Sequence, residues 1–203
     1  MVERIVLWPL GGFALCGSTD GGAAADIKVA IAGPLTHIPQ GLFWILIYAV
    51  AGGGDFITFS RTITTEFLSS GGLHGFLSIL SVHAFWLNID LMVFNLFLPA
   101  YPLDGGRCMA SALILSGFGS YSAAIITSVT AMAIAVVMTV WGLVSFVHLG
   151  HPTGLFAALV GFYIYSSSSR LYNLAQTNRV SEHPLFSQAC FEAGDYVPLS
   201  SES

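Results

Sequence analysis

Asn95-Leu-Phe-Leu-Pro99-Ala-Tyr-Pro102-Leu103-Asp104-Gly105-Gly106-Arg107 is the segment in which a long apolar run ends in two prolines, a carboxylate and two glycines. A charged side chain inside a bilayer costs about 2.5–3.5 kcal/mol on insertion scales, so it is kept where it has a partner or a function. Holding a metal ion is one such function for Asp104. Capping the helix that follows is the alternative, because an N-cap aspartate accepts a backbone N–H.

The composition around this segment is that of a membrane protein. Hydrophobic residues make up 55% of the 203 and charged residues 8%, whereas a soluble domain is about a quarter charged. The chain therefore predicts an integral, multi-pass protein whose surroundings are the lipid bilayer. The net charge is −5 and the six basic residues are scattered, so nucleic acid is not an expected partner.

The N-terminal part is too interrupted to cross a membrane as a helix. Residues 5–17 are apolar but contain Pro9 and several glycines, which favours a short hairpin or a re-entrant segment. Residues 18–26 are polar and predict a turn. Residues 55–72 carry Arg61 and Glu66 among threonines and serines, and indicate an interfacial loop.

Longer apolar runs predict the membrane helices. We expect spans over 27–50, 73–98, 121–149 and 155–174, and a further helical stretch over 107–116. Gly33-Pro34 and Pro39 should kink the first span. The prediction is an all-α polytopic membrane protein with about four to five membrane helices and a short N-terminal hairpin or re-entrant segment. It comprises one membrane-embedded domain over 1–175 and a polar tail over 176–203.

Polar residues inside these spans are the remaining candidates for a site. Asn95 is either a partner in an interhelical hydrogen bond or a donor to a developing negative charge. His37 follows the Gly33-Pro34 break and is either a packing residue or a polar group facing a cavity. His148 and His151 share one helix face only if they lie on a helix, and Gly150 and Pro152 favour a turn there instead.

Three segments in this order resemble the site-2 protease family of intramembrane zinc metalloproteases: Trp8-Pro-Leu-Gly-Gly12, Ala32-Gly-Pro-Leu35, and the run from Asn95 through Asp104 to Arg107. The resemblance implies a catalytic zinc within the membrane and membrane-embedded protein substrates. In the family, two histidines of a His-Glu-x-x-His helix and the aspartate matching Asp104 bind the zinc, and the glutamate activates the bound water. Asn95 and His37 would then be catalytic-site residues that position the substrate carbonyl.

The chain lacks the motif that supplies most of the zinc ligands in the family. None of its six histidines is followed by glutamate, so no His-Glu-x-x-His is present. We therefore expect an N-terminally incomplete metalloprotease that is inactive as it stands, and whether the chain is an enzyme stays open. One alternative is a non-catalytic relative that binds membrane proteins as a scaffold or regulator. Another is a small polytopic transporter component, a class that also uses broken helices.

Overall fold

The computed structural model describes residues 2–8, 11–16, 22–51, 72–183 and 186. The chain folds as two compact units, one formed by 1–30 together with 99–203 and the other by 31–98. The interfacial loop expected over 55–72 lies outside the described residues except for Gly72, which begins helix α4 (Gly72–Phe97), and most of the expected C-terminal tail lies outside them as well. The division into a domain over 1–175 and a tail over 176–203 stays a prediction.

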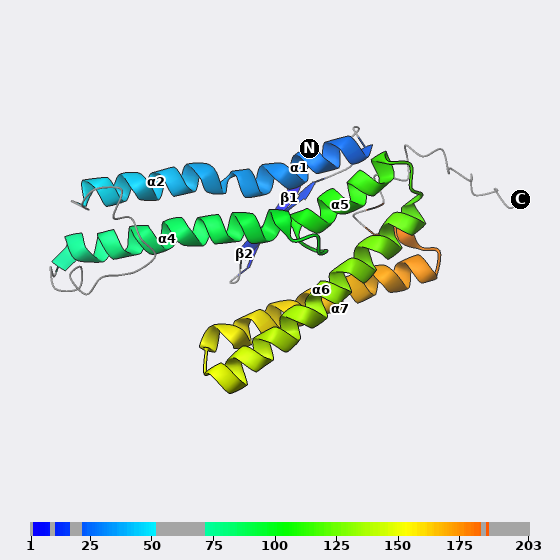
Figure 1. The fold of residues 1–203 in the computed structure, drawn as a ribbon. Helices are drawn as coiled ribbons and strands as arrows, with labels where there is room; N and C mark the ends of the chain where they lie inside the picture. The colour runs from blue at the N-terminus through cyan, green and yellow to red at the C-terminus, as the bar shows by residue number, and fades with distance from the viewer. Residues whose placement is uncertain (1, 9–10, 17–21, 52–71, 184–185, 187–203) are drawn as a thin grey trace, which may run out of the picture. The chain divides into compact units, whose positions relative to one another are not determined.

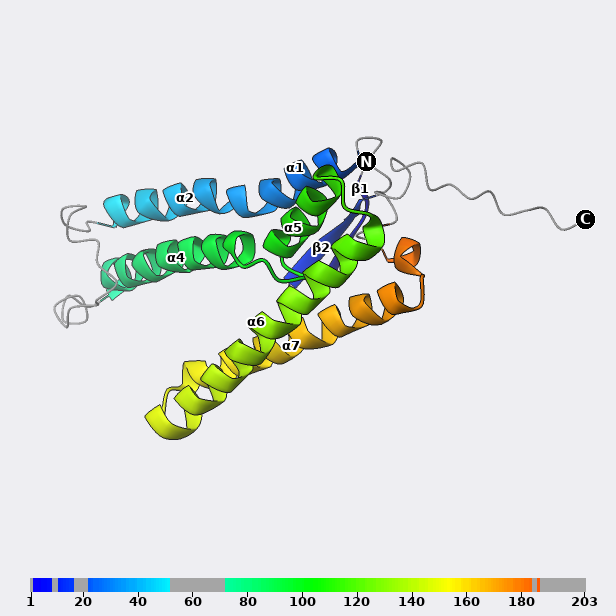
Figure 2. The same ribbon diagram turned by 45° about the vertical axis from the view of Figure 1, so that its right-hand side comes forward.

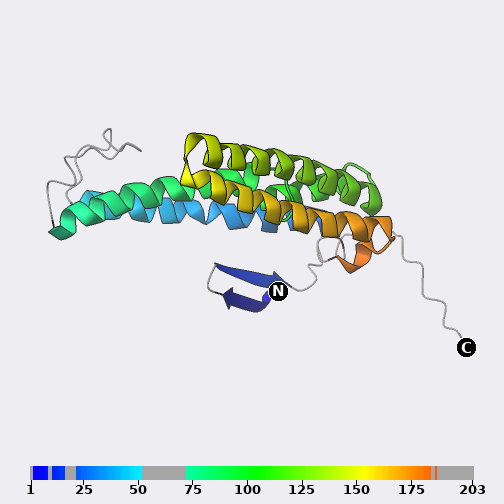
Figure 3. The same ribbon diagram turned by 90° about the horizontal axis from the view of Figure 1, so that it is seen from below.

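The N-terminal segment is a β-hairpin, as expected. Strands β1 (Val2–Trp8) and β2 (Gly11–Cys16) pair antiparallel, with Trp8 opposite Gly11 and Val2 opposite Cys16. Figure 3 shows the two strands as antiparallel arrows. This pairing satisfies the backbone groups along the facing edges of the two strands.

Helix α1 (Gly22–Leu35) begins within the stretch for which a turn was predicted, so that prediction was wrong over residues 22–26. The reason is the run Ala23-Ala-Ala25, because alanine is the strongest helix former. The consequence for function is that Asp26 lies on a helix rather than in a turn.

The predicted kink in the first span is confirmed. Helix α1 ends at Leu35, Thr36 is a turn residue, and α2 runs from His37 to Val50. Pro34 and Pro39 flank the break and lack the N–H that a continuous helix needs. The Thr36 hydroxyl donates to the Gly33 carbonyl at 2.6 Å, which satisfies a carbonyl close to Pro34.

Helix α4 (Gly72–Phe97) confirms the helix expected over 73–98 and packs against α2. The two helices lie side by side in Figures 1 and 2. Gly41 of α2 faces the ring of Phe85, and a Cβ built on Gly41 would meet that ring at 3.5 Å. That distance is ordinary van der Waals contact, so the Phe85 ring packs directly against this position of α2.

The unit formed by 1–30 and 99–203 also contains α5 (Asp104–Leu115), α6 (Ser120–Leu149), α7 (Pro152–Gln176) and the short 3₁₀ helix η2 (Val180–Glu182). Helices α6 and α7 form an antiparallel pair (Figure 1), joined by a turn in which Gly150 has a φ of 65°. The turn expected over 150–154 is confirmed at Gly150 and His151 only, because α6 ends at Leu149 and α7 already begins at Pro152, a residue favoured in the first turn of a helix.

Small residues bring the backbones of α6 and α7 together. A Cβ on Gly142 would lie 2.6 Å from both the Gly154 carbonyl oxygen and the Ala158 nitrogen, and a Cβ on Gly161 would lie 2.9 Å from the Ala135 oxygen. Close approach through glycine and alanine is how membrane helices gain van der Waals contact in a medium as apolar as their side chains.

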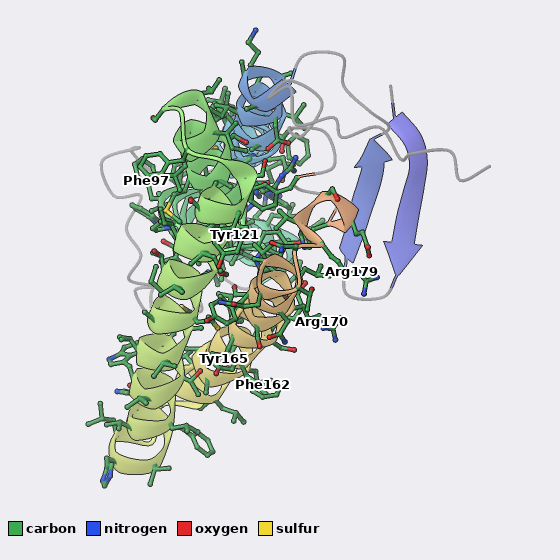
Figure 4. The ribbon with its side chains drawn as sticks, turned by 90° about the vertical axis from the view of Figure 1, so that its right-hand side faces the viewer. Phe97, Tyr121, Phe162, Tyr165, Arg170 and Arg179 are labelled. Carbon is green, nitrogen blue, oxygen red and sulfur yellow. The ribbon has the colours of Figure 1, made fainter. Side chains whose placement is uncertain are left out.

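Three helical segments, Gly22–Val50, Gly72–Phe97 and Ser120–Leu149, are long and apolar enough to cross a membrane. Large apolar side chains of α6 such as Val137 and Trp141 are exposed, and Figure 4 shows Phe162 pointing away from α7. This is the surface expected of an all-α polytopic membrane protein. The helix predicted over 155–174 is confirmed as α7, and its crossing of the bilayer stays a prediction.

Candidate functional site around Asp104

The loop before Asp104 folds back against the helix that Asp104 begins. The Leu103 N–H donates to the Ala100 carbonyl at 2.8 Å, and the Tyr101–Pro102 peptide is cis. A Cβ on Gly106 would lie 2.5 Å from the Ala100 carbonyl carbon and closer still to the Tyr101 nitrogen. Gly106 is therefore required for close backbone approach, one of the two explanations that a glycine at a turn allows.

Asp104 is the first residue of α5, and Leu103 occupies the N-cap position. Asp104 is therefore not the N-cap residue of α5, and the N-cap alternative is wrong. In the first turn its carboxylate lies at the positive end of the helix dipole, a favourable position for a negative side chain. At 12 residues, α5 is too short to cross a bilayer core.

Arg107 lies one turn after Asp104 and contacts two carboxylates. Its Nη2 donates to Oδ1 of Asp26 at 2.5 Å, and its Nη1 lies 3.8 Å from Oδ1 of Asp104. The first contact is a charge-assisted hydrogen bond, whereas the second is an ion pair beyond hydrogen-bond distance. The side chains of Asp26 and Asp104 are 12% and 20% exposed, so solvent screens these charges only in part.

Asp26 is held on its other side by Ser111 of α5, whose hydroxyl donates to Oδ2 at 2.8 Å. Asp26 thereby joins α1 to two successive turns of α5. Asp26 is not among the predicted site residues, because residues 18–26 predicted a turn. A signal was available, since a carboxylate beside an apolar run needs a partner and Arg107 is one of only six basic residues.

The pKa of the Cys108 thiol depends on burial and on three charged groups of this site. Burial raises the pKa of the Cys108 thiol, the carboxylates of Asp104 and Asp26 raise it further, and Arg107 acts in the opposite direction. Two negative groups and one positive group therefore act on the same turn of α5. A thiol with a raised pKa is a poor nucleophile and a poor metal ligand near neutral pH.

Helix α7 and the segment after it contact Tyr101, in the loop before Asp104. Ser168 donates its hydroxyl to the Tyr101 carbonyl at 2.8 Å. The Tyr101 ring packs edge-on against His183, with centroids 5.1 Å apart, and both Val180 and Phe186 are buried in the cluster that includes Ala110. Burial lowers the pKa of His183.

His37 pairs with Asn88 in the unit formed by 31–98. Its Nδ1 lies 2.8 Å from Oδ1 of Asn88, and Nδ2 of Asn88 donates to the Ala84 carbonyl at 2.7 Å. The second bond fixes the amide orientation, so Nδ1 of His37 carries the hydrogen and donates it. Asn88, which is buried, is a partner of His37 that the sequence pattern did not predict.

Asn95 lies near the C-terminal end of α4 and is half-buried. It belongs with His37 to the compact unit 31–98, whereas Asp104 belongs to the other unit. The structure thus joins Asp104 to Asp26 and Arg107, and His37 to Asn88. The catalytic roles expected of Asn95 and His37, and the metal-binding role expected of Asp104, stay predictions.

A complete zinc site needs more ligands than the described residues bring together. Among residues 22–51, 72–183 and 186, no group of three or more histidine, cysteine, aspartate or glutamate side chains is close enough to hold a metal ion. A catalytic zinc takes three protein ligands. The described residues by themselves therefore do not fit a zinc ion, although Asp104 can supply one ligand.

Comparison with known proteins finds that this chain is similar to proteins whose names describe zinc metalloproteases. The chain is 28% identical over 91% of its length to Rip3 of Mycobacterium tuberculosis, a protein whose name gives it as a provisional zinc metalloprotease. It is 24% identical over 89% of its length to a zinc metalloprotease of Methanocaldococcus jannaschii. The chain spans 41% and 42% of these two relatives. No family model and no solved structure matches it.

Proposed function

We propose, from the premise that this chain is site-2-protease-like and related to zinc metalloproteases, that it is the C-terminal part of an intramembrane zinc metalloprotease. The substrates would be membrane-embedded proteins. The observation that carries the proposal is the position of Asp104. Its carboxylate lies in the first turn of α5, directly after a loop whose backbone at Ala100 and Tyr101 packs against Gly106. A ligand held on a short, supported helix is the kind of preorganised group that a metal site needs.

Asp104 is the residue of this chain that would bind zinc. The other ligands and the general base would come from a preceding His-Glu-x-x-His helix in the complete protein. When bound, the zinc would polarise the scissile carbonyl and lower the pKa of a water molecule. The chain of 203 residues without such a helix should be inactive.

Other residues of the chain would act on the substrate rather than on the metal. Asn95 is an amide on a membrane helix, and a positioned amide donor can stabilise an oxyanion. His37, oriented by Asn88, would assist in positioning the substrate carbonyl. The β-hairpin would align an unwound substrate strand, because an extended peptide inside a membrane needs backbone partners.

The proposal is tested by restoring the upstream segment. The genomic DNA before Met1 is translated and searched for a His-Glu-x-x-His in frame or joined by splicing, and the extended protein is reconstituted with a transmembrane substrate. We expect about one zinc ion per protein and chelator-sensitive cleavage, both lost in Asp104→Ala. Cleavage by the 203 residues without the upstream segment, or an upstream region lacking the motif, would contradict it.

The alternative is a non-catalytic relative that binds membrane helices as a scaffold or regulator. It is favoured by the observation that no three-ligand cluster exists among the described residues. A single carboxylate does not hold zinc against competing ligands. Stoichiometric zinc in the purified protein that is lost on Asp104→Ala excludes this alternative, whereas metal-free protein that captures a membrane helix supports it.

A further inference from the structure

We infer that Asp26 is a positioning residue for Asp104, and that it acts by holding the Arg107 guanidinium away from the Asp104 carboxylate. The inference rests on the proposed function in one respect, namely that Asp104 is a metal ligand. Its structural part, the competition of two carboxylates for one guanidinium, stands on the distances within one compact unit.

The geometry gives Arg107 one close partner and one distant partner. Nη2 is 2.5 Å from Asp26, whereas Nη1 is 3.8 Å from Asp104. Asp104 and Arg107 are three residues apart on one helix, a spacing at which a direct ion pair readily forms. The closer contact nevertheless goes to Asp26, which is 81 residues away in the sequence.

The hydrogen bond from Ser111 explains why Arg107 contacts Asp26 more closely than Asp104. The Ser111 hydroxyl donates to Oδ2 of Asp26 at 2.8 Å, so the carboxylate is oriented with Oδ1 towards Arg107. Asp26 is also the less exposed of the two carboxylates, at 12% against 20%. A less exposed charge pair is less screened by solvent and attracts its partner more strongly.

The arrangement matters because a guanidinium and a divalent cation compete for the same carboxylate oxygens. An arginine that moves into a two-pronged pair with Asp104 would occupy the oxygens needed for a metal. One positive charge nearby at a longer distance still compensates the carboxylate electrostatically. Asp26 therefore fixes Arg107 at a distance that stabilises the Asp104 charge without blocking its oxygens.

The structural part is tested by a double-mutant cycle on the 203-residue chain in detergent, without metal or substrate. The variants are Asp104→Asn, Asp26→Asn and the double variant, and the readout is the Tm from circular dichroism. When Asp26 is neutral, Arg107 turns to Asp104, so Asp104→Asn should lower the Tm at least about twice as much in the Asp26→Asn background as in the native background. Additive Tm losses would overturn the inference.

Two matched variants guard against a trivial folding defect. Asp26→Glu keeps the charge and should leave the Asp104→Asn effect near its native size. Ser111→Ala removes the orienting hydroxyl while keeping both carboxylates. In this background, the Tm loss caused by Asp104→Asn should lie between its sizes in the native and the Asp26→Asn backgrounds. If Asp26→Asn does not fold, the cycle of Ser111→Ala with Asp104→Asn takes its place. Additive Tm losses in that cycle overturn the inference.

The functional part is tested in the complete, zinc-loaded protein. Asp26→Asn should lower kcat and zinc retention by about tenfold or more, in the range known for residues that orient metal ligands. Adding Arg107→Gln should restore much of both, because the competing guanidinium is then gone. Absence of rescue overturns the inference even where cleavage confirms the proposed function. A coupled Tm cycle in a protein without protease activity supports the Asp26 inference and rejects the proposed function.

Discussion

The Ser168 hydroxyl of α7 donates a hydrogen bond of 2.8 Å to the carbonyl oxygen of Tyr101, three residues before Asp104. This bond ties a helix from the C-terminal half of the chain to the loop that sets the start of α5. Ser168 is fully buried, so its loss would leave the carbonyl without this donor in an apolar setting. The position of Asp104 therefore depends on α7 as well as on its own helix.

Ser168→Ala tests this dependence. The variant should lose about 1–3 kcal/mol of unfolding free energy, because a partly buried carbonyl loses its side-chain donor. The free energy is measured by SDS titration of the protein in mixed micelles. Ser116→Ala is the control, since Ser116 is exposed at the C-terminal end of α5 and its hydroxyl donates locally to the Ala112 carbonyl. Equal losses in the two variants would show that the Ser168–Tyr101 hydrogen bond contributes no more to the free energy of unfolding than a local hydrogen bond at a helix end.

Gly106→Ala should be more damaging than its small size suggests. The added methyl would lie 2.5 Å from the Ala100 carbonyl carbon and 2.8 Å from its oxygen, and backbone atoms cannot rotate away as a side chain does. We expect a loss of about 1–3 kcal/mol in unfolding free energy from overpacking. Gly119→Ala is the matched control, because a Cβ there meets no atom within 4 Å. A Gly106→Ala protein as stable as the control contradicts the close approach.

Asn88→Ala should weaken the pairing of α2 with α4. It removes the acceptor for His37 Nδ1, and interhelical hydrogen bonds in membrane proteins contribute about 0.6–2 kcal/mol. The loss is measured as a shift in the unfolding midpoint of the purified chain. His83→Ala serves as the control, since His83 is exposed and contacts the Ile79 carbonyl of its own helix. If both variants unfold at the same midpoint, the His37–Asn88 bond does not stabilise the pair.

The stability of the chain should fall as the pH drops below about 6.5, the ordinary pKa of histidine. Burial lowers the pKa of His183 in the folded chain, so the unfolded chain binds a proton first as the pH falls. Stability from this residue is present above about pH 6.5 and declines below it, with protonation of the folded state restricted to still lower pH. The measurement is unfolding free energy against pH between about 5 and 8.

His183→Gln and His183→Phe together separate titration from packing. Both remove the ionisable ring, one with a polar and one with an apolar side chain, so both should flatten the pH dependence even where they differ in overall stability. A slope that is unchanged in both variants would show that other groups control the acid response.

The membrane helices and their interruptions follow from local physics, and the sequence predicted them well. Long apolar runs give α4 and α6, and the prolines at 34 and 39 give the break at Thr36, because these features act within a few residues of themselves. The hairpin was expected on the same grounds, since glycine and proline prevent a spanning helix over 5–17. The turn expected at 22–26 failed because three alanines outweighed the neighbouring polar residues.

By itself the sequence determined that this chain is an apolar helical protein with a carboxylate at the start of α5, and it pointed to the family whose zinc metalloproteases it resembles. Only the tertiary structure decided which groups stand beside that carboxylate. The link from Asp26 to Arg107 joins residues 81 positions apart, and the bond from Ser168 to Tyr101 joins residues 67 apart. Periodicity and composition report the neighbours of a residue along one element. Partners on different helices are fixed by packing, which brings distant side chains within hydrogen-bond distance and leaves no mark in the local pattern.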